Sequence, residues 1–578
     1  MAFQVSPGVQ VQEIDLTNVV PAVSTSIGAY AGAFSWGPVD EIRLISSEKE
    51  LANTFGTPTD TTARSFLTAA SFLKYGNALK VVRSIGAAAT NAADGSITGG
   101  GTTYGPTLIK NRTDFDSVAV NDNTFAAKYP GTLGNSIAVY ILHENANFSE
   151  WTYKSGFSSA PGTSASAAAA GSSNDELHIV VVDSLGKFSG TRGTVLERFA
   201  HVSQAVDAVN TSGGTNYYKN VLNESSKYVW ALNTPAALVR AGTSIYPVKD
   251  FTTNYDAAVA YSTTQIPVTL SNAVDDAPTA ANVQAGLNLF IDPEIVDINL
   301  IFSAGDVNDS QVIANELISI AESRKDCLAF ISPPLEATMG STDPLADVLA
   351  WANGTYNTAA DSIPSTSYAV IDSTAVKVYD KYNDIYRWIP ACGLIAGLCA
   401  NTDRVADSWF SPAGLNRGVI LGVTKLAFNP NQANRDELFK ARVNPIVSFP
   451  GTGIILYGDK TALSKPSAFD AINVRRLFIT LEKAISTSAK AQLFEFNDEF
   501  TRAAFRNAVE PFLREVQGRR GLSDFKVVCD ETNNTGEIID RNEFVADIYV
   551  KPARSIRGIT LSFVATRTGV QFSELAGV

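Results

Sequence analysis

The chain has 578 residues, of which 45% are hydrophobic and 18% are charged, as is typical of folded globular proteins. This length predicts several domains, each with a core of its own. The net charge of −13 at pH 7, without any run of Lys and Arg to offset it, argues against nucleic-acid binding. From residue 471 onward fifteen basic residues nearly balance fourteen acidic ones, so the acidic excess lies in the first 470 residues.

The sequence gives no sign of export or of membrane insertion. Its start lacks a basic segment followed by an apolar one, so we expect no signal peptide and a soluble protein made in the cytoplasm. The longest apolar stretch, Ile389–Ala400, is far shorter than the ~20 residues that span a bilayer. The four cysteines form no C-x-x-C pair, and we interpret them as buried thiols.

The first 90 residues combine an extended segment with α/β alternation. Residues 1–20 alternate in places but are bracketed by Pro7, Gly8 and Pro21, and they are too short to form a sheet alone. We therefore predict an N-terminal arm that pairs with something else. The pattern then predicts strands at 27–34, 42–45 and 79–85 and a helix at 62–75.

A less regular region follows, up to about residue 281. Two tracts of small residues, 86–106 and 155–175, are interpreted as loops or linkers because they offer little apolar surface to bury. The runs 137–142 and 177–182 are typical of strands. We predict a mostly β insertion at the surface of the protein.

Regular α/β patterning resumes at residue 295. An apolar run at 295–302, a helical stripe containing Val312 and Leu317, and a strand at 327–331 together predict a βαβ unit. Further predicted strands are 368–371 and 454–457, and further predicted helices are near 414–424, 435–440 and 472–485.

The last hundred residues predict one long helix followed by strands. The helix covers about 499–517, and the strands cover 526–529, 544–550 and 558–566. After Gly569 the chain alternates again, with no local segment to pair with. We interpret this tail as a second extended arm.

The sequence contains no recognisable catalytic or metal-binding motif. Its three histidines, His143, His178 and His201, are not spaced as metal ligands. The segment Gly453–Thr461 resembles a phosphate-binding loop only superficially, because Asp459 displaces the lysine by one position. Residues 530–540 lack the glycine that a calcium loop requires and are interpreted as a solvated turn. We expect no enzymatic activity, no metal and no cofactor.

Several segments are similar to one known family. They include Val5–Val9, Lys128–Asn135, Leu456–Thr461, Ile539–Phe544 and Lys551–Ser555. On these residues the chain resembles the tail sheath protein of contractile-tailed bacteriophages, most closely the T-even type. The similarity spans nearly the whole chain, is dense from Trp388 onward and is sparse between Gly86 and Ala281.

The resemblance implies a structural subunit that polymerises as stacked hexameric rings around a tail tube. Contraction of the polymer would drive the tube through the host envelope. The implied partners are other copies of the chain, the tube protein, and the baseplate and tail terminator proteins, with no nucleic acid and no membrane insertion. The protein would belong to the virion tail after assembly in the host bacterial cytoplasm.

The predicted fold is a multidomain one that combines α/β and α+β parts. We divide the chain into an N-terminal linking arm (1–20), an α/β middle region (21–90 and 282–470), a variable, mostly β outer insertion (91–281), a C-terminal inner domain that faces the tube (471–567) and a C-terminal linking arm (568–578). In the resembled family the arms reach into neighbouring subunits and complete a small sheet of the inner domain.

Applied to this sequence, the resemblance assigns particular residues to the links. The inter-subunit arms would use Val5, Val9, Val11, Ile14, Val570, Phe572 and Leu575. The receiving strands would contain Phe544, Ile548, Val550, Ile559, Leu561 and Phe563. An exposed strand edge suits this purpose, because it offers main-chain hydrogen bonds to any chain that approaches it.

A further hypothesis concerns the basic residues near the end of the long helix. Arg514, Arg519, Arg520 and Lys526 would face an acidic tube and separate from it on contraction. Ion pairs at a surface are individually weak and are screened by salt, which suits a contact that must break. The alternative is an ordinary solvated helix face.

Two other functions fit parts of the sequence. The chain could form the sheath of a tailocin or another contractile injection system, because the mechanics are shared. It could also be a carbohydrate-binding or enzymatic surface protein built around the insertion. Trp151, Tyr153, Tyr217 and Tyr218 are too dispersed to favour that last alternative.

Overall fold

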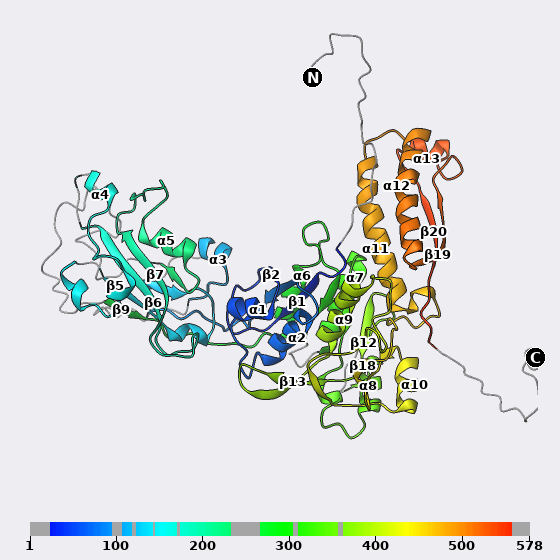
Figure 1. The fold of residues 1–578 in the computed structure, drawn as a ribbon, viewed down its shortest axis with the longest axis horizontal. Coiled ribbons are helices and arrows are strands. Elements are labelled where there is room, and N and C mark those ends of the chain that lie inside the picture. Colours follow the sequence, from blue (N-terminus) through cyan, green and yellow to red (C-terminus); the bar gives the residue numbers. More distant parts are fainter. Residues whose placement is uncertain are drawn as a thin grey trace, which may run out of the picture. The chain divides into compact units, whose positions relative to one another are not determined.

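The computed structural model describes residues 24–94, 107–117, 123–142, 145–169, 171, 174–232, 266–304, 310–356 and 362–557 (Figure 1). Its contacts divide the chain into two compact units. Of the described residues, the larger unit comprises those within 24–408 and 412–475, and the smaller unit comprises 409–411 and 476–557.

The larger unit is organised around a seven-stranded sheet with the order β16-β12-β11-β10-β1-β3-β2. Every neighbouring pair in this sheet is parallel except β2 and β3. The strands are β1 (Gly28–Gly32), β2 (Arg43–Ile45), β3 (Leu79–Arg83), β10 (Leu300–Phe302), β11 (Leu328–Ile331), β12 (Ala369–Asp372) and β16 (Val443–Asn444). The predicted α/β core is therefore confirmed, although the apolar run at 295–302 contributes only its last three residues as a strand.

Helices cover both faces of this sheet, because successive side chains of a buried parallel strand point to opposite faces. Tyr30 contacts the core formed with α1 (Glu48–Phe55), α2 (Ala63–Leu73) and α9 (Cys392–Val405). Its neighbours Ala29 and Ala31 contact the other core. That core includes residues of α6 (Ala280–Asn288), α7 (Ser310–Arg324), α8 (Pro344–Ala352) and α10 (Gln432–Lys440).

The apolar run that begins at Ile389 forms α9, a helix buried on nearly every side. Two of the four cysteines, Cys392 and Cys399, lie in it, and all four are buried free thiols as predicted. Among the described residues no helix is both long and apolar enough to cross a bilayer.

Two smaller sheets complete the middle of the larger unit. Strands β13 (Val376–Asp380), β14 (Ile385–Ile389) and β15 (Val423–Leu426) form an antiparallel sheet, and β17 (Ile446–Phe449) pairs with β18 (Gly453–Leu456). The helix predicted near 414–424 is wrong, because these residues form turns that lead into β15. Gly414 and Gly422 adopt φ angles of 88° and 72°, a left-handed conformation that interrupts a helix.

The outer region is mostly β, as predicted. A four-stranded antiparallel sheet has the order β7-β6-β5-β9, and β4 pairs with β8. The strands are β4 (Phe125–Ala127), β5 (Ile137–Leu142), β6 (Glu176–Asp183), β7 (Thr194–Ser203), β8 (Val229–Ala231) and β9 (Ile266–Thr269), and the helices are α3 (Arg112–Ser117), α4 (Ala165–Ala169) and α5 (Tyr218–Ser225). The tract 155–175 is more ordered than its composition predicted, because it contains α4 with a fully buried Ala167.

The smaller unit contains two long helices and a short sheet. The helices are α11 (Ile472–Ala489) and α12 (Glu499–Gly518), and the remaining elements are β19 (Leu522–Val528), α13 (Gly536–Asp540) and β20 (Asp547–Pro552). Both predicted long helices are confirmed, α11 with four more residues at its C-terminal end than predicted.

A buried carboxyl group lies at the end of β12 in the main sheet. Asp372 is 1% exposed, and it accepts hydrogen bonds from the Ser332 hydroxyl and from the backbone N–H of Thr374. Burial outweighs these hydrogen bonds and raises the pKa of Asp372 to about 8. The carboxyl group is therefore largely protonated in the folded protein at neutral pH.

This protonation makes the stability of the larger unit depend on pH. Because the folded pKa is higher than the unfolded one, stability is lost as pH rises from about 4 through about 8, by at most ~1.4 kcal/mol per pH unit. The substitution Asp372→Asn should flatten this part of the profile. Urea unfolding of both proteins at pH 5, 7 and 9 measures the difference, and parallel profiles would contradict the assignment.

Candidate strand-addition site in the smaller unit

The core of the smaller unit is built by its two long helices. The carboxylate of Asp498 caps α12 by accepting a hydrogen bond of 2.8 Å from the backbone N–H of Thr501. The apolar stripe of α12 packs with that of α11 and with Trp409. The buried residues are Leu477, Leu481 and Ile485 of α11 and Phe505, Val509, Leu513 and Val516 of α12.

Strands β19 and β20 lie on this helical core as an antiparallel pair. In this pair Phe525 lies opposite Val550, and Val527 lies opposite Ile548. These four apolar side chains contact the helical core, yet each is only partly buried. A two-stranded sheet is marginal on its own, and further strands would cover more of this apolar surface.

Both strands have an open edge within the described part of the chain. The sheet has the order β19-β20 and no third strand, so one edge of each strand lacks a partner. Such an edge presents a row of backbone N–H and C=O groups to any extended segment that approaches. The opposite face of the sheet is polar, with Lys551 and Asp524 forming an exposed ion pair of 3.0 Å.

The structure places three of the predicted receiving residues in this site. Ile548 and Val550 lie on β20, and the ring of Phe544 lies 5.5 Å from that of Phe505 between centroids. Phe544 precedes the strand because the backbone N–H and C=O of Val545 bond the side chain of Asn534. The other predicted residues lie outside the described residues; they are Val5, Val9, Val11, Ile14, Ile559, Leu561, Phe563, Val570, Phe572 and Leu575.

Two contributors to the site were missed at the level of sequence. Strand β19 begins at Leu522, four residues before the predicted strand, because the polar residues Ser523 and Asp524 mask its alternation. Asn534 organises the turn before β20 by bonding Val545. The Asn533-Asn534 pair was the available signal, since asparagine side chains commonly substitute for backbone partners in turns.

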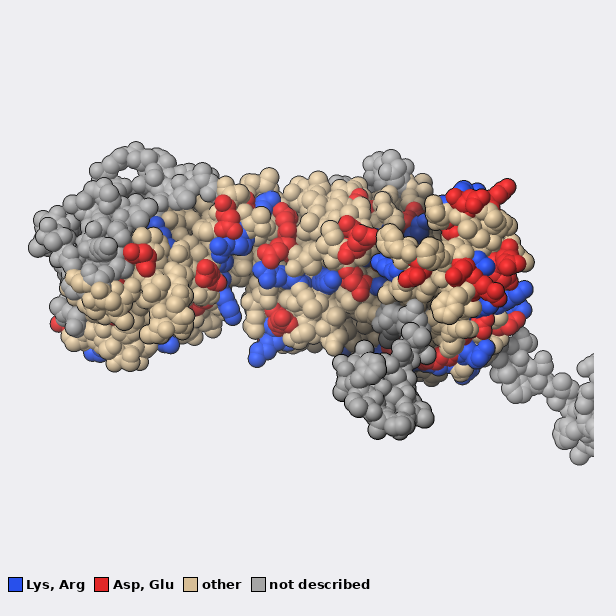
Figure 2. Space-filling view, turned by 90° about the horizontal axis from the view of Figure 1, so that it is seen from above, with Lys and Arg blue, Asp and Glu red and all other residues tan. Residues whose placement is uncertain are grey.

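The four basic residues assigned to a tube contact do not share one element. Arg514 and Arg519 lie 3.8 Å and 3.5 Å from glutamates one helical turn away, and Arg519 also lies 5.4 Å from the Trp409 ring. Arg520 follows the helix with a φ of 67°, and Lys526 lies on β19. On the face shown in Figure 2, acidic and basic side chains are interspersed.

The two described histidines are tied into the outer sheet. His178 is buried, its Nδ1 accepts from the backbone N–H of His201 at 3.1 Å, and its Nε2 donates to the Ser159 carbonyl at 2.9 Å. Burial lowers the pKa of His178 and keeps the ring neutral. Within the described ranges, no group of three His, Cys, Asp or Glu side chains could hold a metal ion.

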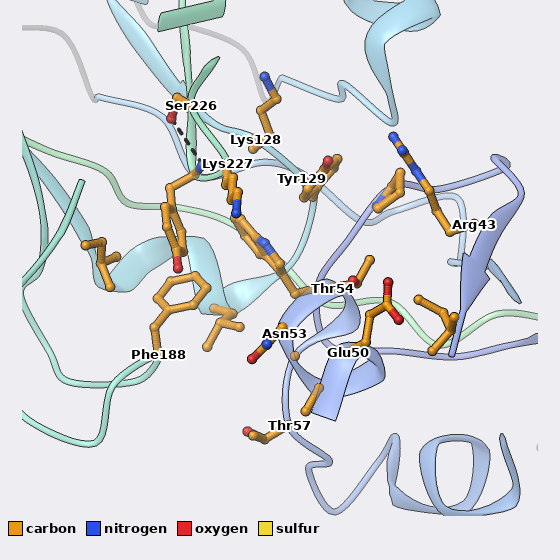
Figure 3. Close-up of a pocket in the computed structure, with 18 of the residues that line it drawn as sticks. Arg43, Glu50, Asn53, Thr54, Thr57, Lys128, Tyr129, Phe188, Ser226 and Lys227 are labelled. Carbon is orange, nitrogen blue, oxygen red and sulfur yellow. Dashed lines mark hydrogen bonds between the residues drawn. The ribbon is translucent and has the colours of Figure 1, made fainter. Parts of the chain in front are cut away.

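A cleft of about 1240 Å³ lies in the larger unit (Figure 3). Arg43, Glu50 and Asn53 line it from β2 and α1, while Phe188 and Lys227 line it from the outer region. Among its lining residues there is no histidine, cysteine or aspartate. The phosphate-loop resemblance also finds no support, because Lys460 donates to the Phe439 carbonyl at 2.9 Å.

Comparison with known proteins matches three family models to the chain. The phage tail sheath protein central domain matches residues 276–462, the phage tail sheath C-terminal domain matches residues 464–566, and the N-terminal region of domain III of tail sheath protein Gp18 matches residues 25–83. The tail sheath proteins of Vibrio phage KVP40 and Enterobacteria phage T4 are each 34% identical to the chain, over 99% of both proteins.

Solved structures of distant proteins share the fold. The sheath tail protein of Desulfitobacterium hafniense has a TM-score of 0.51 at 12% identity and covers 95% of this chain and 100% of its own. The helical sheath of the anti-feeding prophage in its contracted state has a TM-score of 0.50 at 13% identity and covers 98% of this chain and 100% of its own.

Proposed function

The chain belongs to the phage tail sheath family, and from this premise we propose that its copies join by strand addition into stacked hexameric rings around a tail tube. The protein is a structural component of the virion tail. The observation that supports the proposed link is the open two-stranded sheet of the smaller unit, whose apolar face is only partly buried.

The binding free energy of such a link comes from many weak hydrogen bonds acting together. A single main-chain hydrogen bond contributes only about 0.5 to 1.5 kcal/mol net. An arm that adds a strand forms several of them, and each copy has two arms. Main-chain bonds also tolerate different side chains on the arm.

The division into arms, middle region, insertion and inner domain gives each part a mechanical role. The arms, residues 1–20 and 568–578, keep copies connected. The buried α/β core of the larger unit moves as a rigid body between the long and short arrangements of the polymer. Assembly holds the long arrangement, and contraction releases the stored free energy and drives the tube through the host envelope.

The wider partners follow from the same role. The tail tube lies inside the polymer, the baseplate protein lies at one end and the tail terminator protein lies at the other. Assembly takes place in the host bacterial cytoplasm. A role in a tailocin or another contractile injection system would use the same contacts, and the neighbouring genes would separate the two origins.

Loss of the arms should abolish assembly without unfolding the subunit. Deletion of residues 1–20 or of residues 568–578 removes strands from neighbouring copies. We expect electron micrographs of the unmodified protein to show hollow, striated tubes, and those of either deletion variant to show none. Tubes of normal length from both variants would contradict strand addition through the arms.

A point variant separates main-chain pairing from side-chain packing in the same experiment. Proline at positions 9 and 11 (Val9→Pro with Val11→Pro) removes two backbone donors, whereas threonine at both positions keeps them. We expect the proline variant to lose assembly and the threonine variant to retain it.

The basic residues at the end of α12 are proposed to contact an acidic tube. The double reversal Arg519→Glu with Arg520→Glu should weaken assembly on tubes about tenfold, most strongly at low salt. The matched control, Arg541→Glu with Arg554→Glu, reverses two other exposed charges of the smaller unit. Unchanged assembly of the first variant on tubes, measured by co-sedimentation, would show that these residues do not face the tube.

A further inference from the structure

The segment between α11 and α12, together with the first turn of α12, exposes an unusual amount of apolar surface. Leu493, Phe494, Phe496 and Phe500 are 62%, 104%, 84% and 78% exposed. We call these four residues the phenylalanine tip. Single exposed apolar residues are common on proteins, but contiguous ones of this size mark interaction surfaces.

The tip is held by a hydrogen-bonded frame. Asn497, in the middle of the tip, donates from its side-chain amide to Asn534 Oδ1 at 3.1 Å and to the Glu543 carbonyl at 2.8 Å. Arg502, which is 6% exposed, donates to Asn497 Oδ1 at 2.8 Å. The phenylalanines are thus presented from a fixed backbone and not from a loose loop, which lowers the entropy lost on binding.

The backbone at the tip is itself unusual. Phe494 has a φ of 71°, in the left-handed region that glycine and asparagine favour and bulky residues avoid. The residue in this strained position is also the most exposed large apolar side chain that the structure describes. Strain of this kind is retained where the surrounding structure or a function requires it.

The frame also connects the tip to the strand-addition site. Asn534, which accepts from Asn497, bonds the backbone of Val545, two residues before β20. A neighbouring copy that adds a strand beside β20 is therefore brought close to the tip. The area is sufficient for a real contact, because three phenylalanine rings bury roughly 450 to 750 Å², compared with about 800 Å² per partner in a standard interface.

We propose that the phenylalanine tip is a contact between copies, in which the rings of one subunit insert into an apolar surface of a second copy of this chain. The inference rests on the proposed polymerisation. Main-chain hydrogen bonds between strands do not select a particular partner. The side chains of the phenylalanine tip would supply that selectivity. The tip would thereby fix the register of the added strand.

Photo-crosslinking of the full-length protein identifies what covers the tip. A benzoyl-phenylalanine placed at position 494 keeps an aromatic side chain there. In tubes assembled from this chain alone, irradiation should produce covalent dimers and larger products. Crosslinks found only within one chain, only to added tube protein, or not at all would overturn the proposal.

A substitution measures the strength of the contact. The variant Phe494→Ser with Phe496→Ser should raise the critical concentration for assembly at least about tenfold. Its thermal unfolding as a free subunit should not change, because these side chains are exposed there. The matched control, Leu44→Ser with Ile295→Ser, alters two exposed apolar residues of the larger unit (59% and 80%) and should assemble normally.

The two proposals fail in distinguishable ways. If the unmodified protein assembles and the tip variant assembles at the same critical concentration, the tip inference is wrong and strand addition stands. If the unmodified protein does not assemble under any condition, both proposals are wrong.

Discussion

The unpaired edges of β19 and β20 are the constraint on which the rest of the account depends. Within the described residues two strands leave the apolar side chains that they share with α11 and α12 incompletely covered, and Phe525, Val527, Ile548 and Val550 are only partly buried. A soluble protein normally hides such an edge, because it promotes uncontrolled association. In a sheath subunit the same edge is useful, since under the proposal of strand addition it accepts an extended segment of another copy.

The larger unit differs from the smaller one in that its main sheet is fully packed between helices. Its main sheet is covered on both faces, and the buried α9 fills one of them. A close-packed core of this kind resists deformation and behaves as a rigid body. The mechanical work of a contractile polymer then falls on the links between copies. The phenylalanine tip adds side-chain specificity at that link, because its frame shares Asn534 with the turn that precedes β20.

The helices and strands that could be predicted from the sequence are those whose hydrophobic periodicity matches their burial in the fold. The strands around Tyr30 and Phe302 and the helices α11 and α12 have strong periodicity, and the structure contains them. The helix predicted near Gly414 failed because two glycines adopt left-handed backbone angles that periodicity does not detect. Strand β19 was predicted too short because Ser523 and Asp524 obscure its alternation. The exposure of Phe494, Phe496 and Phe500 was not predicted, and the structure shows it.

A helical reconstruction of the assembled protein by electron cryomicroscopy tests the central claim most directly. The account predicts that each inner domain contains a sheet with more than two strands, in which β19 and β20 of one copy are joined by extended segments of other copies. Density for these segments would continue into neighbouring subunits. A polymer in which the β19-β20 pair remains two-stranded, with copies joined only by side-chain contacts, would contradict the account.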